Sequence, residues 1–402
     1  MKKSLLALAA VGAFAGAAHA QSSVTVYGVL DASYTAIESN STTTAGAKTT
    51  AQVRNTVNGD GALSTSRLGL RGVEDLGGGL SAQFVLEWDL INLGNGATGD
   101  GATQATTSGA AGATTSTGRG FGPRYSYIGL SSKELGTLRL GRQETSIHGV
   151  IASNLAGQAN NTLGSLYSSL DSTYQLATAQ SPGVRPHNVF IDNAYTFISN
   201  NIGGVVVQLQ TAQNAYSASQ TTASAGVQAS GGSITYTGVK NLQVAAGMIV
   251  EGTTTASVSN IKRNTRAVGA NYDFGVARLF ALHTQNKVTN LNLTSGDVLS
   301  DTKLTEVGVR APVSKVIDVW GSYFTGSRTN NGTNVTTLGV TVATTAAGAA
   351  DAKGYQLGTT YAFSKRTTAY GIYGYQELKG NGAANGAKLD GSMYAIGLRH
   401  TF

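Results

Sequence analysis

Several arginines in the first half of the chain lie in short segments in which every second residue is apolar. In "SRLGLRG", Leu68 and Leu70 share one face of an extended segment, so Arg67 and Arg71 share the other. The stretch "TLRLGR" places Arg139 in the same way. A guanidinium is a permanent cation that binds carboxylates, phosphates and other anions. Attraction of anions is therefore the chemistry that this pattern predicts.

Groups for covalent or metal chemistry are scarce. There is no Cys, and the histidines after residue 20 are His148, His187, His283 and His400. His148 and His187 bracket a Ser-rich segment containing Asp171, but no nucleophile elbow accompanies them. No Cys/His set has zinc spacing. The sequence predicts neither an enzyme nor a cofactor nor a metal site. No Lys/Arg run with interleaved aromatics follows residue 20, so we expect no nucleic-acid partner.

The first residues, "MKKSLLALAAVGAFAGAAHA", combine two lysines, a short apolar run and a small-x-small ending. This pattern is typical of a secretory signal peptide, and the run is too short for a good membrane-spanning helix. We expect residues 1–20 to be removed and residues 21–402 to form a single domain outside the cytoplasm.

Composition argues against an ordinary soluble protein. Only 12% of the residues are charged, where soluble proteins have about a quarter. Mean hydropathy is −0.04, and no long apolar run follows residue 20. A transmembrane β-barrel fits both facts, because each strand needs only about 9–11 residues and alternate residues face lipid.

Alternating stretches recur along the chain, and the connections between them are alternately short and long. The short connections include "EDLGGG", "SSKELG", "SNNIGG", "DFGV" and "FSKRT", and the long ones are rich in Thr, Ala, Gly and Asn. About sixteen candidate strands result. The sequence thus predicts an all-β fold, a 16-stranded antiparallel transmembrane barrel with short periplasmic turns and long extracellular loops. A soluble β-solenoid would need a fixed short repeat, and none is present.

The last ten residues, "MYAIGLRHTF", predict the closing strand. Tyr394, Ile396, Leu398, His400 and Phe402 are expected to face lipid. The stretch "YQLGTTYAF" predicts the same alternation, with its tyrosines, Leu and Phe outward. In "DVWGSYFTG" and "AYGIYGYQE" the faces cannot be assigned, which indicates contact with another subunit rather than with lipid.

Several strings resemble the general porins of Gram-negative outer membranes, in the form found in β-proteobacteria. They are "SSVTVYGVLDASY", "SRLGLRGVEDLGGGLSAQFVLE", "YSYIGLSSKELGTLRLGRQ", "YAFSKRTTAYGIY" and "GLRHTF". The resemblance implies a passive channel for small hydrophilic solutes and a homotrimer with one pore per subunit. It also implies a third long loop, here about residues 145–184, folded into the lumen. The expected surroundings are outer-membrane lipids, lipopolysaccharide and the assembly machinery, which reads Phe402 as a signal.

Strict alternation directs Arg142 toward lipid, at a cost of about 2–4 kcal/mol near the midplane, so we expect a bulge at Gly141. The resemblance then places Arg142 at the constriction, together with Arg67 and with Arg185, which opens the strand after the third loop. The predicted pore residues are a basic wall of Arg67, Arg142 and Arg185, flanking Arg71, Arg124 and Arg139, and the acids Glu87, Glu144 and Asp171.

The third loop contains a single acid, Asp171, with Glu144 at its entrance. Related cation-selective porins carry an acidic patch there, so its absence predicts a positively charged neck that prefers anions. A channel specific for phosphate or another anion remains the alternative. Each arginine has a simpler interpretation as a solvated wall residue paired with Glu87 or Asp89.

Overall fold

The computed structural model describes residues 23–43, 45–58, 61–91, 120–158, 160–167, 189–213, 226–254, 261–290, 298–330, 335–337, 340–342, 348–381 and 387–402. The predicted signal peptide lies outside these residues. None of the described helices is both long and apolar enough to cross a membrane.

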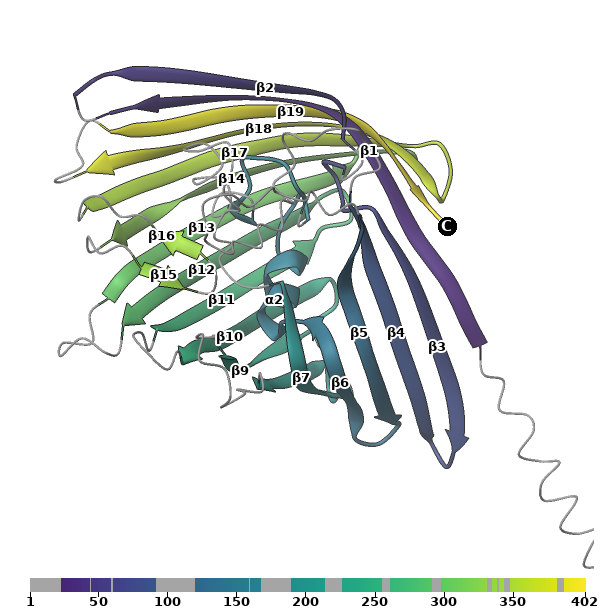
Figure 1. Ribbon diagram of the computed structural model, residues 1–402. Coiled ribbons are helices and arrows are strands. Elements are labelled where there is room, and N and C mark those ends of the chain that lie inside the picture. The colour runs from purple at the N-terminus through teal and green to yellow at the C-terminus, as the bar shows by residue number, and fades with distance from the viewer. Residues whose placement is uncertain are drawn as a thin grey trace, which may run out of the picture.

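Sixteen antiparallel strands close into a barrel, as the alternation predicts (Figure 1). Strand β2 (Lys48–Asn58) pairs only with β1, and β15 (Val335–Thr337) and β16 (Val340–Val342) form a separate hairpin. The barrel strands are β1 (Ser23–Thr42), β3 (Arg67–Gly77), β4 (Leu80–Ile91), β5 (Gly120–Ser132), β6 (Gly136–Glu144), β7 (Phe190–Ser199), β8 (Val205–Gln213), β9 (Gly226–Tyr236), β10 (Leu242–Thr254), β11 (Ile261–Asp273), β12 (Arg278–Asn290), β13 (Val298–Pro312), β14 (Ile317–Asn330), β17 (Gly348–Ala362), β18 (Thr367–Asn381) and β19 (Lys388–Thr401).

Strand β1 closes the barrel by pairing with β19 along one edge. Along its other edge it pairs first with β3 and then with β2. Phe402 and Gly28 exchange two backbone hydrogen bonds of 3.1 Å. The Phe402 ring covers Gly28, where a Cβ atom would lie 2.3 Å from it. The predicted closing strand is therefore confirmed, and Phe402 is its last pairing residue.

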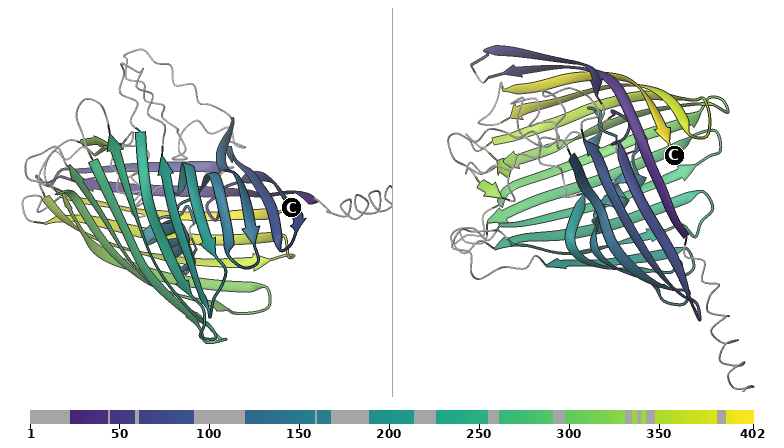
Figure 2. Two further views of the ribbon diagram at one scale, coloured as in Figure 1. Left: turned by 90° about the horizontal axis from the view of Figure 1, so that it is seen from below. Right: turned by 45° about the vertical axis from the view of Figure 1, so that its right-hand side comes forward.

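The polar stretch from Thr35 to Asn58 has the composition of the predicted long loops, but most of it forms strands. Strand β1 continues to Thr42 and returns as β2, so a polar hairpin extends the barrel wall (Figure 2). Its cross-strand side chains bond to each other: Gln52 donates to Glu38 (2.9 Å) and Thr50 to Asn40 (2.8 Å). Polar cross-strand pairs stabilise this hairpin without the apolar alternation that marks the other strands.

The predicted lipid-facing residues are exposed on the outer surface. In β19 and just beyond it, Tyr394, Ile396, Leu398 and Phe402 are 42–66% exposed, whereas Ala395 is buried. In β17, Leu357 is exposed and Gln356 is fully buried. The predicted alternation of both strands is thereby confirmed.

The two strands with unassigned faces are β14 and β18, and each carries large apolar residues on its inner face as well as its outer face. Trp320 and Phe324 of β14, and Tyr370 and Ile372 of β18, are all buried on the inner face. They contact chain that lies inside the barrel, so both faces of these strands are apolar. These inner contacts account for the apolar inner face, and a subunit contact on the outer face stays a prediction.

The third long loop folds into the barrel over its described part, residues 145–158 and 160–167. This segment, called the inward loop below, contains helix α2 (Ser146–Ser153), which lies inside the strands (Figure 1). Ile147, Val150 and Ile151 are buried against the inner wall. The wall opposite them is built from small residues, one on each of five successive strands: Ala194, Ala212, Ala229, Ala245 and Ala267. Their small size leaves room for the helix to pack closely.

Candidate pore constriction

The inward loop spans the lumen and is bonded at both ends. Near β6, the Ser146 N–H donates to Gln210 Oε1 (2.9 Å). On the far side, the Asn161 N–H and the Thr162 hydroxyl both donate to the carbonyl of Ala62 (3.0 and 3.2 Å), in the segment between β2 and β3. The loop is therefore held at two separate points inside the barrel, and it narrows the lumen between them.

From Thr162 onward, two buried side chains of the wall hold the loop backbone. Gln356 Nε2 donates to the carbonyls of Thr162 (3.2 Å) and Leu163 (3.0 Å). Glu306, which is 2% exposed, accepts hydrogen bonds from the Leu166 N–H (2.5 Å) and the Ser165 hydroxyl (3.3 Å). These bonds satisfy loop groups that would otherwise be buried without partners.

Glycines allow the loop to contact the wall directly. A Cβ on Gly374 of β18 would lie 1.8 Å from the carbonyl oxygen of Leu163. Gly164 has φ of +86°, and a Cβ there would lie 2.0 Å from the carbonyl of Tyr355. Side chains at either position would push the loop into the remaining opening.

A cavity of about 1300 Å³ remains beside the loop. His148, Ser153 and Ala156 of the loop line one side, and Arg67, Glu87 and Arg124 line the facing wall. The described part of the loop contains no Asp, Glu, Lys or Arg. Among the residues that the structure describes, all the charge at this level therefore comes from the barrel wall.

The strongest charge cluster on that wall joins three strands. Arg124 of β5 binds Glu87 (Nε to Oε1, 2.6 Å) and Asp89 (Nη1 to Oδ1, 2.9 Å) of β4. Arg67 of β3 approaches Glu87 at 3.9 Å and stays 26% exposed in its side chain. A bulge between Glu87 and Trp88 lets Arg124 point inward. Arg67 and Arg124 face the opening, although the sequence predicted Arg124 only as a flanking residue.

The predicted bulge at Gly141 is present. Gly141 has φ of +126°, and the register between β6 and β7 shifts after it. Arg142 donates to the carbonyl of Pro123 (2.9 Å) and binds Asp192 (2.7 Å). Its guanidinium also lies over the Phe190 ring, at 5.4 Å. Arg142 is not among the residues that line the cavity.

The other predicted residues are distributed as follows. Arg71 lies over Tyr27 (5.2 Å) and Arg139 over Tyr127 (5.1 Å), and neither lines the cavity. Glu144 lines the cavity, at 3.9 Å from His148 Nε2. Arg185 and Asp171 lie outside the described residues, as does the rest of the third loop to residue 184.

The lumen contains cations that sequence reasoning missed. Arg399 of β19 lines the cavity and donates to Ser64 Oγ (3.1 Å). Arg278 and Arg310 are direct partners on β12 and β13, and Lys315 follows in the next turn. Alternation was the signal that could have found them, because Leu279, Val309 and Leu398 point outward beside them. Among the described lining residues, six cations (Arg67, Arg124, Arg278, Arg310, Lys315 and Arg399) face four acids (Glu87, Glu144, Asp273 and Asp318).

Nothing in the described part of the chain resembles a metal or catalytic centre. No cluster of three or more His, Cys, Asp and Glu side chains is found there. His148 contacts Tyr167 and Glu144, while His283 and His400 are exposed and bonded to Thr305 and Thr367. His187 lies outside the described residues.

Comparison with known proteins gives a consistent result. The family model for Gram-negative porins matches residues 7–381. Outer membrane porin protein 32 of Delftia acidovorans is 28% identical over the full length of both chains. An outer membrane porin of Bordetella pertussis is 38% identical over 36% of this chain and 34% of its own.

Solved structures share the fold. The anion-selective porin from Comamonas acidovorans is 24% identical and superposes with a TM-score of 0.65, covering 95% of this chain and 100% of its own. OmpT of Vibrio cholerae, in its trimer form, is 14% identical with a TM-score of 0.59, covering 95% and 99%. A membrane-spanning barrel, an inward loop and a charged water-accessible lumen thus coincide with a family match over most of the sequence. The chain belongs to the Gram-negative porins, which are channels of the outer membrane and not enzymes.

Proposed function

We propose that this porin prefers anions, because its neck carries an excess of fixed positive charge. An open pore selects by its radius and by the electrostatic field at its narrowest level. The observation that supports this most directly is the uncharged inward loop facing Arg67 and Arg124. No loop acid within the described residues offsets these guanidiniums. The similar porin from Comamonas acidovorans is anion-selective, which agrees with this proposal.

The two wall arginines have different roles in this proposal. Arg124 is neutralised by Glu87 and Asp89, and it fixes those acids against the wall. Arg67 lies farther from Glu87 and keeps more of its surface in water, so it is the group that a passing anion meets. Arg399 adds to the same field, since it also lines the cavity. Arg142 and Arg185 stay predicted members of the basic wall.

The test is the reversal potential across a planar bilayer in a KCl gradient. We expect the native pore to favour chloride, and Arg67→Ala to move the potential toward the cation side. Lys48→Ala, which removes a cation from the start of the polar hairpin strand β2, is the matched control. A native pore that favours potassium would refute the proposal. Adding millimolar phosphate to the same bilayer tests a phosphate-specific channel, which would be blocked where a general pore would not.

We also infer that the protein is a homotrimer. The trimer form of the Vibrio cholerae relative supports this assembly. Crosslinking in native outer membranes should give a ladder that ends at three subunits. Recognition of Phe402 by the assembly machinery is a further part of the proposal, and it predicts that Phe402→Ala lowers the amount of barrel inserted in cells.

A further inference from the structure

Arg399 of β19 and Asp31 of β1 are direct cross-strand partners. Opposite charges placed in this way ordinarily attract each other across the sheet. Here the guanidinium bonds to a serine instead, because Arg399 Nε donates to Ser64 Oγ (3.1 Å). The Ser64 hydroxyl in turn donates to Asp31 Oδ2 (3.1 Å). One uncharged side chain therefore lies between the two charges.

The Asp31 carboxylate, which is 1% exposed, is bonded to uncharged donors. Its Oδ2 accepts the Ser64 N–H (2.7 Å) as well as the Ser64 hydroxyl, and its Oδ1 accepts the Tyr370 hydroxyl (2.5 Å). The Tyr370 oxygen is itself the acceptor of the Ala62 N–H (3.1 Å), so its own proton lies toward Asp31. Three donors on two oxygens satisfy this buried carboxylate without an arginine.

Residues 61–66, called the linking segment below, hold Ser64 in this place. The segment packs so closely on Asp31 that a Cβ on Gly61 would lie 1.8 Å from Oδ1. The Gly61 N–H (3.0 Å) and the Ser66 hydroxyl (3.1 Å) both donate to the Asp31 carbonyl. The linking segment is thus fixed to β1 on both sides of Ser64, which keeps the serine hydroxyl between the carboxylate and the guanidinium.

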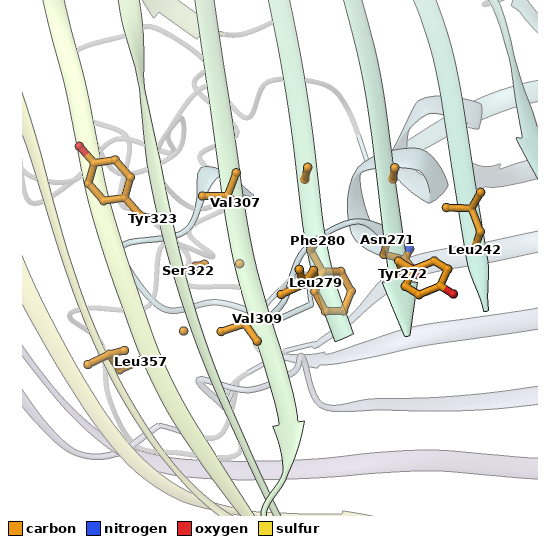
Figure 3. Close-up of a pocket in the computed structure, with 14 residues that line it drawn as sticks. Leu242, Asn271, Tyr272, Leu279, Phe280, Val307, Val309, Ser322, Tyr323 and Leu357 are labelled. Carbon is orange, nitrogen blue, oxygen red and sulfur yellow. The ribbon is translucent and has the colours of Figure 1, made fainter. Parts of the chain in front are cut away.

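Other arginines of the cavity lie directly against an acid. On β13, Val309 lines a groove on the outer face (Figure 3), and the next residue, Arg310, faces the lumen. Arg310 binds Asp318 (3.4 Å), and Arg124 is paired with acids in the same way. A direct ion pair weakens the field that an arginine contributes to the lumen. Arg399 lines the same cavity and bonds to a neutral oxygen, so its charge is less compensated.

We propose that Ser64 strengthens the anion preference of the pore by keeping Arg399 apart from Asp31. With the hydroxyl in place, the Arg399 guanidinium offers its remaining N–H groups and its charge to an anion in the lumen. Without the hydroxyl, the guanidinium can reach Asp31 Oδ2 and form a neutralising ion pair. The inference rests on the proposed anion preference, and it assigns part of that preference to an uncharged residue.

The test compares reversal potentials in a KCl gradient for the native pore and its variants. Ser64→Ala leaves the formal charge of the pore unchanged. It should nevertheless move the potential toward the potassium side, by about half the shift that Arg399→Gln gives, because an ion pair weakens a charge without removing it. Ser64→Thr keeps the hydroxyl and should give the native potential. Ser131→Ala is the matched control, because the Ser131 hydroxyl bonds to the Thr137 hydroxyl (2.9 Å) and does not line the cavity.

An Asp31→Asn background separates this role from a purely structural one. The asparagine carries no charge to neutralise Arg399, so adding Ser64→Ala to Asp31→Asn should give no further shift. An equal shift in the presence and absence of Asp31 would overturn the proposal. A Ser64→Ala pore with the native potential would also overturn it, and so would a Ser64→Thr pore that shifts as far as Ser64→Ala. These last two comparisons decide the matter even if Asp31→Asn fails to assemble.

Fold is checked for every variant by the heat-dependent shift of the barrel on gels and by single-channel conductance. The effect of Ser64→Ala is read relative to the native pore, which keeps the two proposals distinguishable. A native pore that favours potassium would refute the proposed function. A native pore that favours chloride, and whose potential does not change in Ser64→Ala, would refute the role of Ser64 and leave the anion preference standing.

Discussion

Two regions of the lumen wall differ in how they meet the inward loop. The region formed by β7–β11 presents alanines, and α2 packs directly on them. The region formed by β3–β5 and β19 presents Arg67, Arg124 and Arg399 to the cavity. Small apolar residues thus line the wall on which α2 lies, and the wall beside the cavity carries the charge. The position of helix α2 and the ion selectivity of the pore are therefore set by different residues, so each property can be altered alone.

The largest effect is expected on β18, where the loop backbone touches the wall most closely. In Gly374→Ala, the new methyl group would meet the carbonyl of Leu163, so the loop must move at a cost of about 1–3 kcal/mol. We expect altered single-channel conductance and lower resistance to heat. Gly371→Ala in the same strand is the control, because the nearest atom there is 3.9 Å away. Equal behaviour of the two variants would mean that this contact does not hold the loop.

The next effect concerns the buried carboxylate that holds the loop. Glu306→Ala removes the acceptor of the Leu166 N–H and the Ser165 hydroxyl, which should cost about 1–3 kcal/mol of stability. We expect frequent brief closures in current recordings. Glu306→Gln keeps an acceptor oxygen and should give steadier currents than Glu306→Ala. If both variants closed as rarely as the native pore in these recordings, the hydrogen bonds would have no part in holding the loop.

In the charged region of the wall, the contributions of Arg124 and Arg142 to ion selectivity can be measured separately. Arg124→Gln leaves Glu87, which is 4% exposed, without its closest cation. The reversal potential should therefore shift toward cations. Arg142→Gln should shift it less, because Arg142 is bonded to Pro123 and Asp192 and does not line the cavity. An equal shift in the two variants would place Arg142 in the ion path.

The smallest effect is expected for Arg139→Gln. The Arg139 guanidinium lies against the Tyr127 ring and outside the cavity. Its removal should leave the reversal potential unchanged and cost about 0.5–1 kcal/mol from the lost ring contact. Urea titration measures the second quantity. A clear loss of chloride preference in this variant would mean that Arg139 also contributes to ion selectivity.

The sequence predicted the barrel because apolar alternation and turn composition recur in most of its strands. The turns "DFGV" and "FSKRT", the closing strand and the bulge at Gly141 all follow from local rules. The polar hairpin of β1 and β2 was missed, since its stabilising pairs, such as Gln52 with Glu38, have no apolar alternation.

The attachment of the inward loop could not be predicted from local patterns. Asn160 and Gln356 bond to each other, although 196 residues separate them in sequence. Such contacts have no periodic signature in either segment. For the same reason, apolar residues on both faces of β14 and β18 were attributed to a neighbouring subunit. The inner set, including Trp320 and Tyr370, packs inside the barrel.

Attachment of the inward loop to Ala62, on the side opposite β6, has a mechanical consequence. A chain segment that is attached to the wall at two points moves less under thermal motion than one attached at a single point. The width of the pore beside the loop should therefore vary little over time. For neutral sugars of increasing size, the permeation rate should fall within a short interval of molecular diameter instead of declining gradually.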